Sequence, residues 1–222
     1  MFKHYYYQCH STIANLILHH QTKMKHMKNK SILTLTLSLL LLQLVSFTSI
    51  AQVKYSSKDY SNLVVSGTST MHDWDMKSAN GICDATFTFS GDGKITGLSN
   101  LSFVTNVAEL KSGKGAMDKN AYKALKKDKF ATIKYTAASG TVSTTDGVNY
   151  SVKSTGKLTI AGSTHDVQLI SSLKLNADKS ITVAGSQAIK MKDYGVEPPS
   201  FMFGAVKTGN DITIKFNLTL KK

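Results

Sequence analysis

The sequence contains no arginine, so all 27 of its basic side chains are lysines, set against 14 acidic residues. Arginine is the side chain that recognises guanine and phosphate through paired hydrogen bonds, and its absence argues against a dedicated nucleic-acid reader. We therefore expect no nucleic-acid partner. The formal net charge of +13 favours solubility and is compatible with peripheral contact with an anionic membrane surface.

Cysteine and proline are also scarce, with two of each in 222 residues. Only Cys83 falls within residues 52–222, so that part of the chain can form no internal disulfide and must gain its stability from packing. We expect Cys83 to be a small buried apolar side chain. Both prolines stand in one loop, residues 193–204, which also contains Phe201 and Phe203. Two aromatic residues in a loop suggest a portal for an apolar ligand or a cover over the core.

The usual catalytic motifs are missing as well. No serine stands in a G-x-S-x-G setting, and we find no dinucleotide fingerprint and no P-loop. We therefore predict no enzyme activity, no catalytic residue, no metal and no cofactor.

The histidines leave one alternative open. Residues 52–222 contain only His72 and His165, and an aspartate follows each. Two such pairs could meet to bind a metal ion or support hydrolysis. Alternatively, the Ser, Thr and Asp residues around them form turns at strand ends by bonding their own backbone.

The first 51 residues differ from the rest, because they hold five lysines and no acidic residue. Lys25, Lys28 and Lys30 precede an apolar run over residues 32–45, and residues 49–51 form a small-x-small cleavage signal. This order is typical of a secretory signal peptide cleaved near Ala51-Gln52, with Met24 or Met27 as the true start. We expect an exported protein, periplasmic or secreted, with one domain over residues 52–222.

Within that domain, apolar and polar residues alternate with a period of two, which predicts strands. The clearest run covers residues 212–220, and similar runs cover residues 150–160, 167–175 and 181–189. One segment, residues 117–125, is helical in pattern, with Asp118 as its possible N-cap. About eight strands and one short helix predict an all-β fold, an antiparallel sandwich or barrel.

Four stretches of this pattern resemble the YceI-like family of exported, polyisoprenoid-binding bacterial proteins. They are residues 66–74 (SGTSTMHDW), residues 101–135 with the helix, residues 156–167 (GKLTIAGSTHDV) and residues 193–196 (DYGV). The third stretch is the most specific. The resemblance implies an eight-stranded antiparallel lipocalin-like barrel with one short helix, enclosing an apolar tunnel.

It also implies a soluble protein that sequesters or carries a long isoprenoid or a similar lipid. The alternatives are an exported metal-binding or hydrolytic protein using His72 and His165, and a protein-interaction barrel whose interior is filled by side chains. For the lipid-binding function we predict the following residues to line or gate the tunnel: Trp74, Phe87, Phe89, Leu101, Phe103, Phe130, Tyr135, Leu158, Ile160, Leu169, Phe201 and Phe203.

Overall fold

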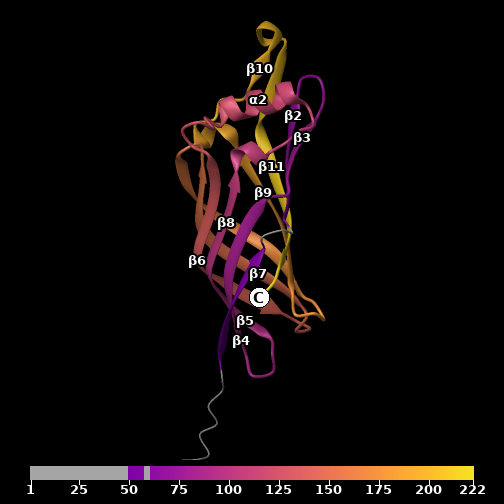
Figure 1. Ribbon diagram of the computed structural model, residues 1–222, viewed down its shortest axis with the longest axis vertical. Helices are drawn as coiled ribbons and strands as arrows, with labels where there is room; N and C mark the ends of the chain where they lie inside the picture. The colour runs from indigo at the N-terminus through magenta and orange to yellow at the C-terminus, as the bar shows by residue number, and fades with distance from the viewer. Residues whose placement is uncertain (1–49, 58–60) are drawn as a thin grey trace, which may run out of the picture. The chain divides into compact units, whose positions relative to one another are not determined.

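A computed structural model describes residues 50–57 and 61–222, so nearly all of the predicted export segment lies outside the described residues. The chain forms strands and only short helices (Figure 1). The strands are β1 (Ala51–Ser57), β2 (Ser61–Ser69), β3 (Trp74–Ser78), β4 (Gly81–Phe89), β5 (Ile95–Asn106), β6 (Thr132–Thr144), β7 (Asn149–Ile160), β8 (Ser163–Leu175), β9 (Ile181–Lys190), β10 (Ser200–Phe201) and β11 (Val206–Leu220). The helices are η1 (Val107–Glu109), α2 (Gly115–Ala124), η2 (Met191–Tyr194) and η3 (Met202–Gly204).

Ten of these strands form one curled antiparallel sheet in the order β1-β4-β5-β6-β7-β8-β9-β11-β2-β3, and β10 pairs with β11. Two short bridges join parts of the chain that are distant in this order. Ser56 of β1 exchanges backbone hydrogen bonds of 2.8 and 2.9 Å with Lys221, just after β11. Lys77 of β3 pairs in the same way with Lys111, just before α2. Each edge strand of the sheet, β1 and β3, is therefore held by one bridge to another part of the chain.

The structure differs from the expected eight strands, since eleven are present in its described residues. One reason is a tight turn at residues 69–72, which divides residues 61–78 into two strands. The Ser69 hydroxyl donates to the His72 carbonyl at 2.7 Å and accepts from the backbone N–H groups of Met71 and His72. This turn reverses the chain and converts residues 61–78 into the β2–β3 hairpin. The turn-forming interpretation of the residues around His72 is thereby confirmed.

Helix α2 lies where the sequence predicts a helix over residues 117–125, but it begins two residues earlier, at Gly115. Asp118 is not the N-cap, because it already lies inside the first turn and Lys114 occupies the cap position. Its carboxylate instead accepts hydrogen bonds from the backbone N–H (2.8 Å) and hydroxyl (2.6 Å) of Ser112. Asp118 therefore fixes the loop that leads into the helix. Among the described residues, no helix has the length and apolar character needed to cross a membrane.

The two ends of the curled sheet are packed differently. We call the end with α2, β10 and the β2–β3 turn the helix end (Figure 1). The half nearer the opposite end is filled by a continuous core that includes Tyr55, Phe87, Ile181 and Leu220, each 2% exposed or less. Cys83 belongs to this core, as predicted, and burial followed by the charge of Asp84 raises the pKa of its thiol to about 12.

Candidate functional site

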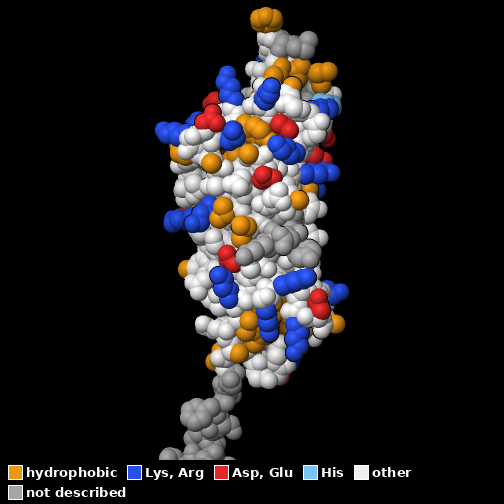
Figure 2. Space-filling view, viewed as in Figure 1, with side chains coloured by type: hydrophobic (Ala, Val, Ile, Leu, Met, Phe, Trp, Pro, Cys, Tyr) orange, Lys and Arg blue, Asp and Glu red, His pale blue; other side chains and the backbone are white. Residues whose placement is uncertain are grey.

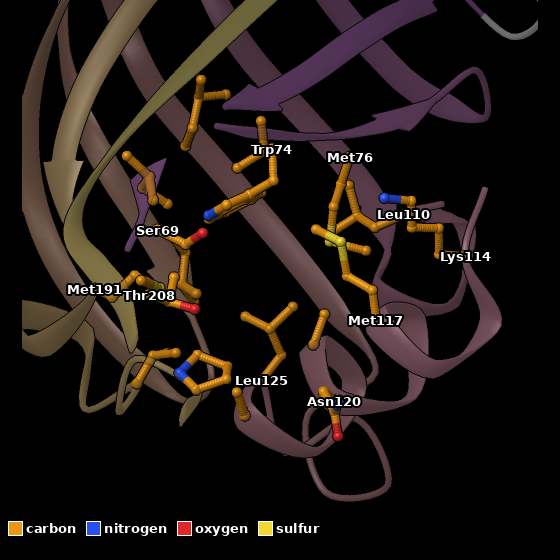
Figure 3. A pocket seen from close by; sticks show the side chains of 18 of the residues that line it. Ser69, Trp74, Met76, Leu110, Lys114, Met117, Asn120, Leu125, Met191 and Thr208 are labelled. Carbon is orange, nitrogen blue, oxygen red and sulfur yellow. The ribbon is translucent and has the colours of Figure 1, made fainter. Parts of the chain in front are cut away.

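A cavity of about 410 Å³ lies at the helix end, between the sheet and α2 (Figure 3). This volume falls within the range of small-molecule sites, about 300–1,000 Å³. Most of the residues that line it are apolar, and they come from strands far apart in the chain. They include Val65, Trp74, Met76, Leu110, Met117, Ala121, Leu125, Ile133, Ile160, Ile189, Met191, Tyr194, Val196, Phe201, Ile212 and Ile214.

The register of the sheet explains how these residues meet. Ile214 of β11 is paired with Val65 of β2, and Val65 is paired in turn with Met76 of β3. Side chains on neighbouring strands at one level point to the same face, so the three form one row on the inner wall. All three line the cavity.

Trp74 forms part of the wall at the start of β3. Its indole lies against Gly67, where an added Cβ atom would come within 2.3 Å of the ring. The indole N–H donates a hydrogen bond of 3.0 Å to the Thr68 carbonyl oxygen, which satisfies its polar group. Glycine at position 67 therefore makes room for the ring, and the hydrogen bond fixes its orientation.

Helix α2 supplies the opposite wall through Met117, Ala121 and Leu125, the last at its C-cap. These positions recur at a spacing of four residues, so they share one face of the helix. On another face, the Tyr122 hydroxyl lies 2.9 Å from the carbonyl oxygens of Ala108 and Leu110. The Lys111 ammonium group donates to the same hydroxyl at 2.9 Å. Tyr122 therefore anchors the helix to the segment before it while the apolar face borders the cavity.

The polar residues of the lining are few. Ser69, His72, Lys114, Asn120 and Thr208 contribute to it, and the side chains of His72 and Lys114 are exposed to solvent. The Tyr194 hydroxyl is a further polar group, and burial, followed by the charge of Asp193, raises its pKa. That phenol therefore stays neutral at physiological pH. Such a lining suits an apolar molecule that carries a polar end.

The predicted site residues are not all brought together. Trp74, Ile160 and Phe201 line the cavity. Leu101, Phe103, Tyr135, Leu158 and Leu169 pack in the cluster that adjoins it, and none of them is among its lining residues. Phe87 and Phe89 lie in the core of the other half.

The two remaining predicted residues lie elsewhere. Phe130 packs on the β7–β8 turn, where its ring occupies the space over Gly162. Phe203 is fully exposed at a left-handed backbone position (φ 56°). The roles proposed for these twelve residues in ligand binding remain predictions.

Sequence reasoning missed the contribution of α2 to the wall. Met117, Ala121 and Leu125 were recognised as an apolar stripe, and that stripe was the available signal. The stripe was assigned no role in a site, and none of the residues of α2 is buried. Met191, Tyr194 and Val196 were missed because the segment between β9 and β10 has no regular periodicity.

The two histidines do not share this site. His72 lines the cavity, whereas His165 lies on β8 outside the lining, with its ring centroid 4.9 Å from that of Tyr194. No group of three or more His, Cys, Asp or Glu side chains suited to a metal ion occurs in residues 50–57 and 61–222.

The described residues form a curled antiparallel sheet with an apolar cavity at one end, and comparison with known proteins shows the family. Residues 45–220 match the model of the YceI-like domain family. The chain therefore belongs to the YceI-like family, as its sequence motifs predict.

Two solved structures are similar in fold. BcnA from Burkholderia cenocepacia is 16% identical, with a TM-score of 0.55, and the match covers 72% of this chain and 95% of BcnA. A polyisoprenoid-binding domain from Saccharophagus degradans, implicated in plant cell wall breakdown, is 11% identical, with a TM-score of 0.56, and the match covers 77% and 99% of the two chains. Comparison with curated protein sequences finds no match.

Proposed function

We propose that this protein binds an isoprenoid or a similar lipid-like amphiphile in the cavity at the helix end and sequesters or carries it without chemical change. The observation that carries the proposal is the apolar wall between the sheet and α2 (Figure 3). The polyisoprenoid-binding relative supports the ligand class. A lipocalin-like mode of binding, with the curled sheet enclosing the chain, belongs to the same proposal.

The binding energy comes from removing the apolar chain from water. At about 0.8 kcal/mol per buried CH₂ group, a fifteen-carbon chain gains roughly 12 kcal/mol. Association costs at least about 4 kcal/mol, so roughly 8 kcal/mol remains at best. That value corresponds to micromolar affinity. The polar residues of the lining would then contact the polar end of the ligand, where Lys114 favours an anionic or hydroxylated group.

Two substitutions on α2 test the proposal. Ala121 lines the cavity, and Lys123 of the same helix is exposed. We expect Ala121→Trp to fill the cavity and abolish binding of farnesol, a fifteen-carbon prenyl alcohol, in a native mass-spectrometric titration. Lys123→Trp adds the same ring outside the cavity and should leave binding intact. Equal binding by wild type and both variants would place the ligand elsewhere and overturn the proposal.

We further propose export and transient contact with a membrane surface at the helix end. The export segment supports the first proposal, and peptide mapping of the N-terminus of the protein isolated from its host tests it. For the second, Met71 and Phe203 are exposed by 71% and 113%, and their loops are joined by a hydrogen bond from the Thr70 hydroxyl to the Ala205 carbonyl oxygen. Exposed lysines share this face with hydrophobic side chains (Figure 2).

A vesicle sedimentation assay tests this contact. We expect the protein to sediment with vesicles that contain phosphatidylglycerol, and Phe203→Ser to reduce the bound fraction severalfold. Thr141→Ser, an exposed change elsewhere on the sheet, is the control. Unchanged binding by Phe203→Ser would contradict a contact through the helix end. The alternative function based on His72 and His165 gains no support, because only the first lines the cavity.

A further inference from the structure

The cavity does not extend through the curled sheet, and side chains from successive rows show where it ends. On β11, Ile212 and Ile214 line it, whereas Phe216, two residues further along, does not. Leu218 and Leu220 follow at 4% and 1% exposure, so the interior is filled from there onward. The transition from cavity to packed core therefore occurs at Phe216.

Other strands change at the same level. Ile133 of β6 lines the cavity, but Tyr135 does not. On β7, which runs in the opposite direction, Ile160 lines the cavity and Leu158 does not. Tyr135 is paired with Leu158 on one side and with Phe103 on the other, so these three form one continuous row.

The opposite wall carries a matching row. Phe216 is paired with Leu63 on one side and with Gly185 on the other. A Cβ atom on Gly185 would come within 2.4 Å of the Phe216 ring, so that glycine leaves space that the ring occupies. Phe103 and Phe216 both pack against the filled core and against a further cluster, formed by Leu63, Met76 and Leu110, at the helix end. The two rings therefore lie at the boundary between the two halves.

We infer that Phe103 and Phe216, with Tyr135 and Leu158, form a floor that limits this site to a short prenyl chain of about three to four isoprene units. The inference deepens the proposed function and rests on it. It goes against the long tunnel that the family resemblance implies.

The length follows from strand geometry. The lining extends along β11 from Val206 to Ile214, eight residues apart. A bulge lies between Thr208 and Ile212, where four steps on β11 match two on β2, so the lining spans six residues in register with the sheet. Six residues span about 20 Å along a strand, and a tilt of about 40° reduces the depth to about 15 Å. An extended chain advances roughly 1.1–1.2 Å per bond, so an isoprene unit of four chain bonds advances about 4.5 Å. About three to four units therefore reach from the rim to the floor.

A series of prenyl alcohols tests the limit: geraniol, farnesol, geranylgeraniol and solanesol, with 10, 15, 20 and 45 carbons. Binding to the full chain is followed through the fluorescence of Trp74, the only tryptophan in the sequence and part of the wall. We expect affinity to rise roughly tenfold or more with each unit as far as farnesol or geranylgeraniol, because each unit buries further apolar surface. Solanesol should bind no more tightly, because its remaining units stay in water.

Two variants move the floor in opposite directions. Phe216→Ala removes one ring and should extend the rise in affinity by about one further unit. Ile214→Phe adds a ring one row nearer the rim and should lower the affinity for geranylgeraniol at least tenfold, while geraniol is little affected. If Phe216→Ala fails to fold, the affinity of Ile214→Phe for geranylgeraniol still tests where the floor lies. The matched control is Ile170→Phe, the same change at a position of β8 that is 59% exposed.

The outcomes separate the inference from the proposed function. If no prenyl alcohol binds, the proposed function is wrong and the inference falls with it. If all of them bind and affinity still rises from geranylgeraniol to solanesol, the floor is wrong while the function stands. A plateau that neither Phe216→Ala nor Ile214→Phe moves would also overturn the assignment of the floor.

Discussion

The contact between Gly67 and Trp74 shows how a single residue shapes the wall of the cavity. Gly67 is buried, and any side chain there would collide with the indole. We expect Gly67→Ala to displace Trp74, shift its fluorescence emission to longer wavelength and lower the free energy of unfolding by about 1–3 kcal/mol, the usual cost of overpacking. Fluorescence spectra and urea unfolding measure both effects.

Gly91 provides the matched control, because nothing lies within 4 Å of the position that its Cβ atom would take. Gly91→Ala should leave the emission spectrum and the midpoint of unfolding unchanged. If Gly67→Ala behaved like this control, the close approach of the indole to residue 67 would be wrong.

Cys83 is a second residue whose surroundings decide its chemistry. The thiolate is the reactive form of cysteine, and the raised pKa of this thiol, about 12, leaves little thiolate at pH 8. We expect Cys83 in a Cys9→Ser variant to react with Ellman's reagent orders of magnitude more slowly in the folded protein than in urea. Rapid reaction at pH 8 without denaturant would show that Cys83 is accessible and is not part of the core.

At the scale of the element, the β6–β7 hairpin depends on Asp146 in its turn. The Asp146 carboxylate accepts hydrogen bonds from the backbone N–H groups of Val148 (2.9 Å) and Asn149 (2.7 Å) and from the Asn149 side chain (2.7 Å). These hydrogen bonds, those of Asn149 first, lower its pKa from 3.8 to about 2. The ionised carboxylate therefore holds the turn.

The pH dependence follows from that shift. Because the pKa is lower in the folded state, the contribution of Asp146 to stability is fully present above about pH 4 and is lost as the pH falls through about 2. Asp146→Ala should therefore lower the urea midpoint at pH 7, and the difference from wild type should shrink towards pH 2. An equal difference at both pH values would mean that the ionised carboxylate is not what stabilises the turn.

Much of the element pattern could be predicted from the sequence, because one face of each strand is buried. In β7, Tyr150, Val152 and Ser154 are buried while Ser151, Lys153 and Thr155 between and after them are exposed, and the sequence alternates in the same way. Turn formation around His72 was one of two interpretations that the sequence left open, because the turn depends on the Ser69 hydroxyl and contains no glycine or proline. The number of strands was underestimated in consequence.

At the scale of the whole molecule, the sequence predicts which residues point inward but not whether they leave space. Phe87 and Trp74 look equivalent as inward aromatic residues, yet one lies in the filled core and the other borders the cavity. The difference arises from the pairing of strands distant in sequence and from the position of α2, which local periodicity does not encode. For this reason the candidate site was predicted less completely than the fold.

This division predicts that equal substitutions in the two halves have unequal costs. Ile181 is fully buried in the filled core, whereas Ile214 borders the cavity. Ile181→Ala should lower the free energy of unfolding by about 3–4 kcal/mol, because it leaves a cavity among packed neighbours. Ile214→Ala should cost only about 1–2 kcal/mol, because part of its side chain already faces empty space and has fewer packing contacts to lose.

Urea unfolding of both variants without ligand measures these costs, and farnesol binding gives the complementary readout. Ile214→Ala should change the affinity for farnesol severalfold, whereas Ile181→Ala should leave it near the wild-type value. Equal costs, or a change in affinity only in Ile181→Ala, would contradict the division. Ile181→Ala should thus have the larger effect on stability and Ile214→Ala the larger effect on affinity. Packing in the filled half stabilises the sheet, while the space left at the helix end is available to a ligand.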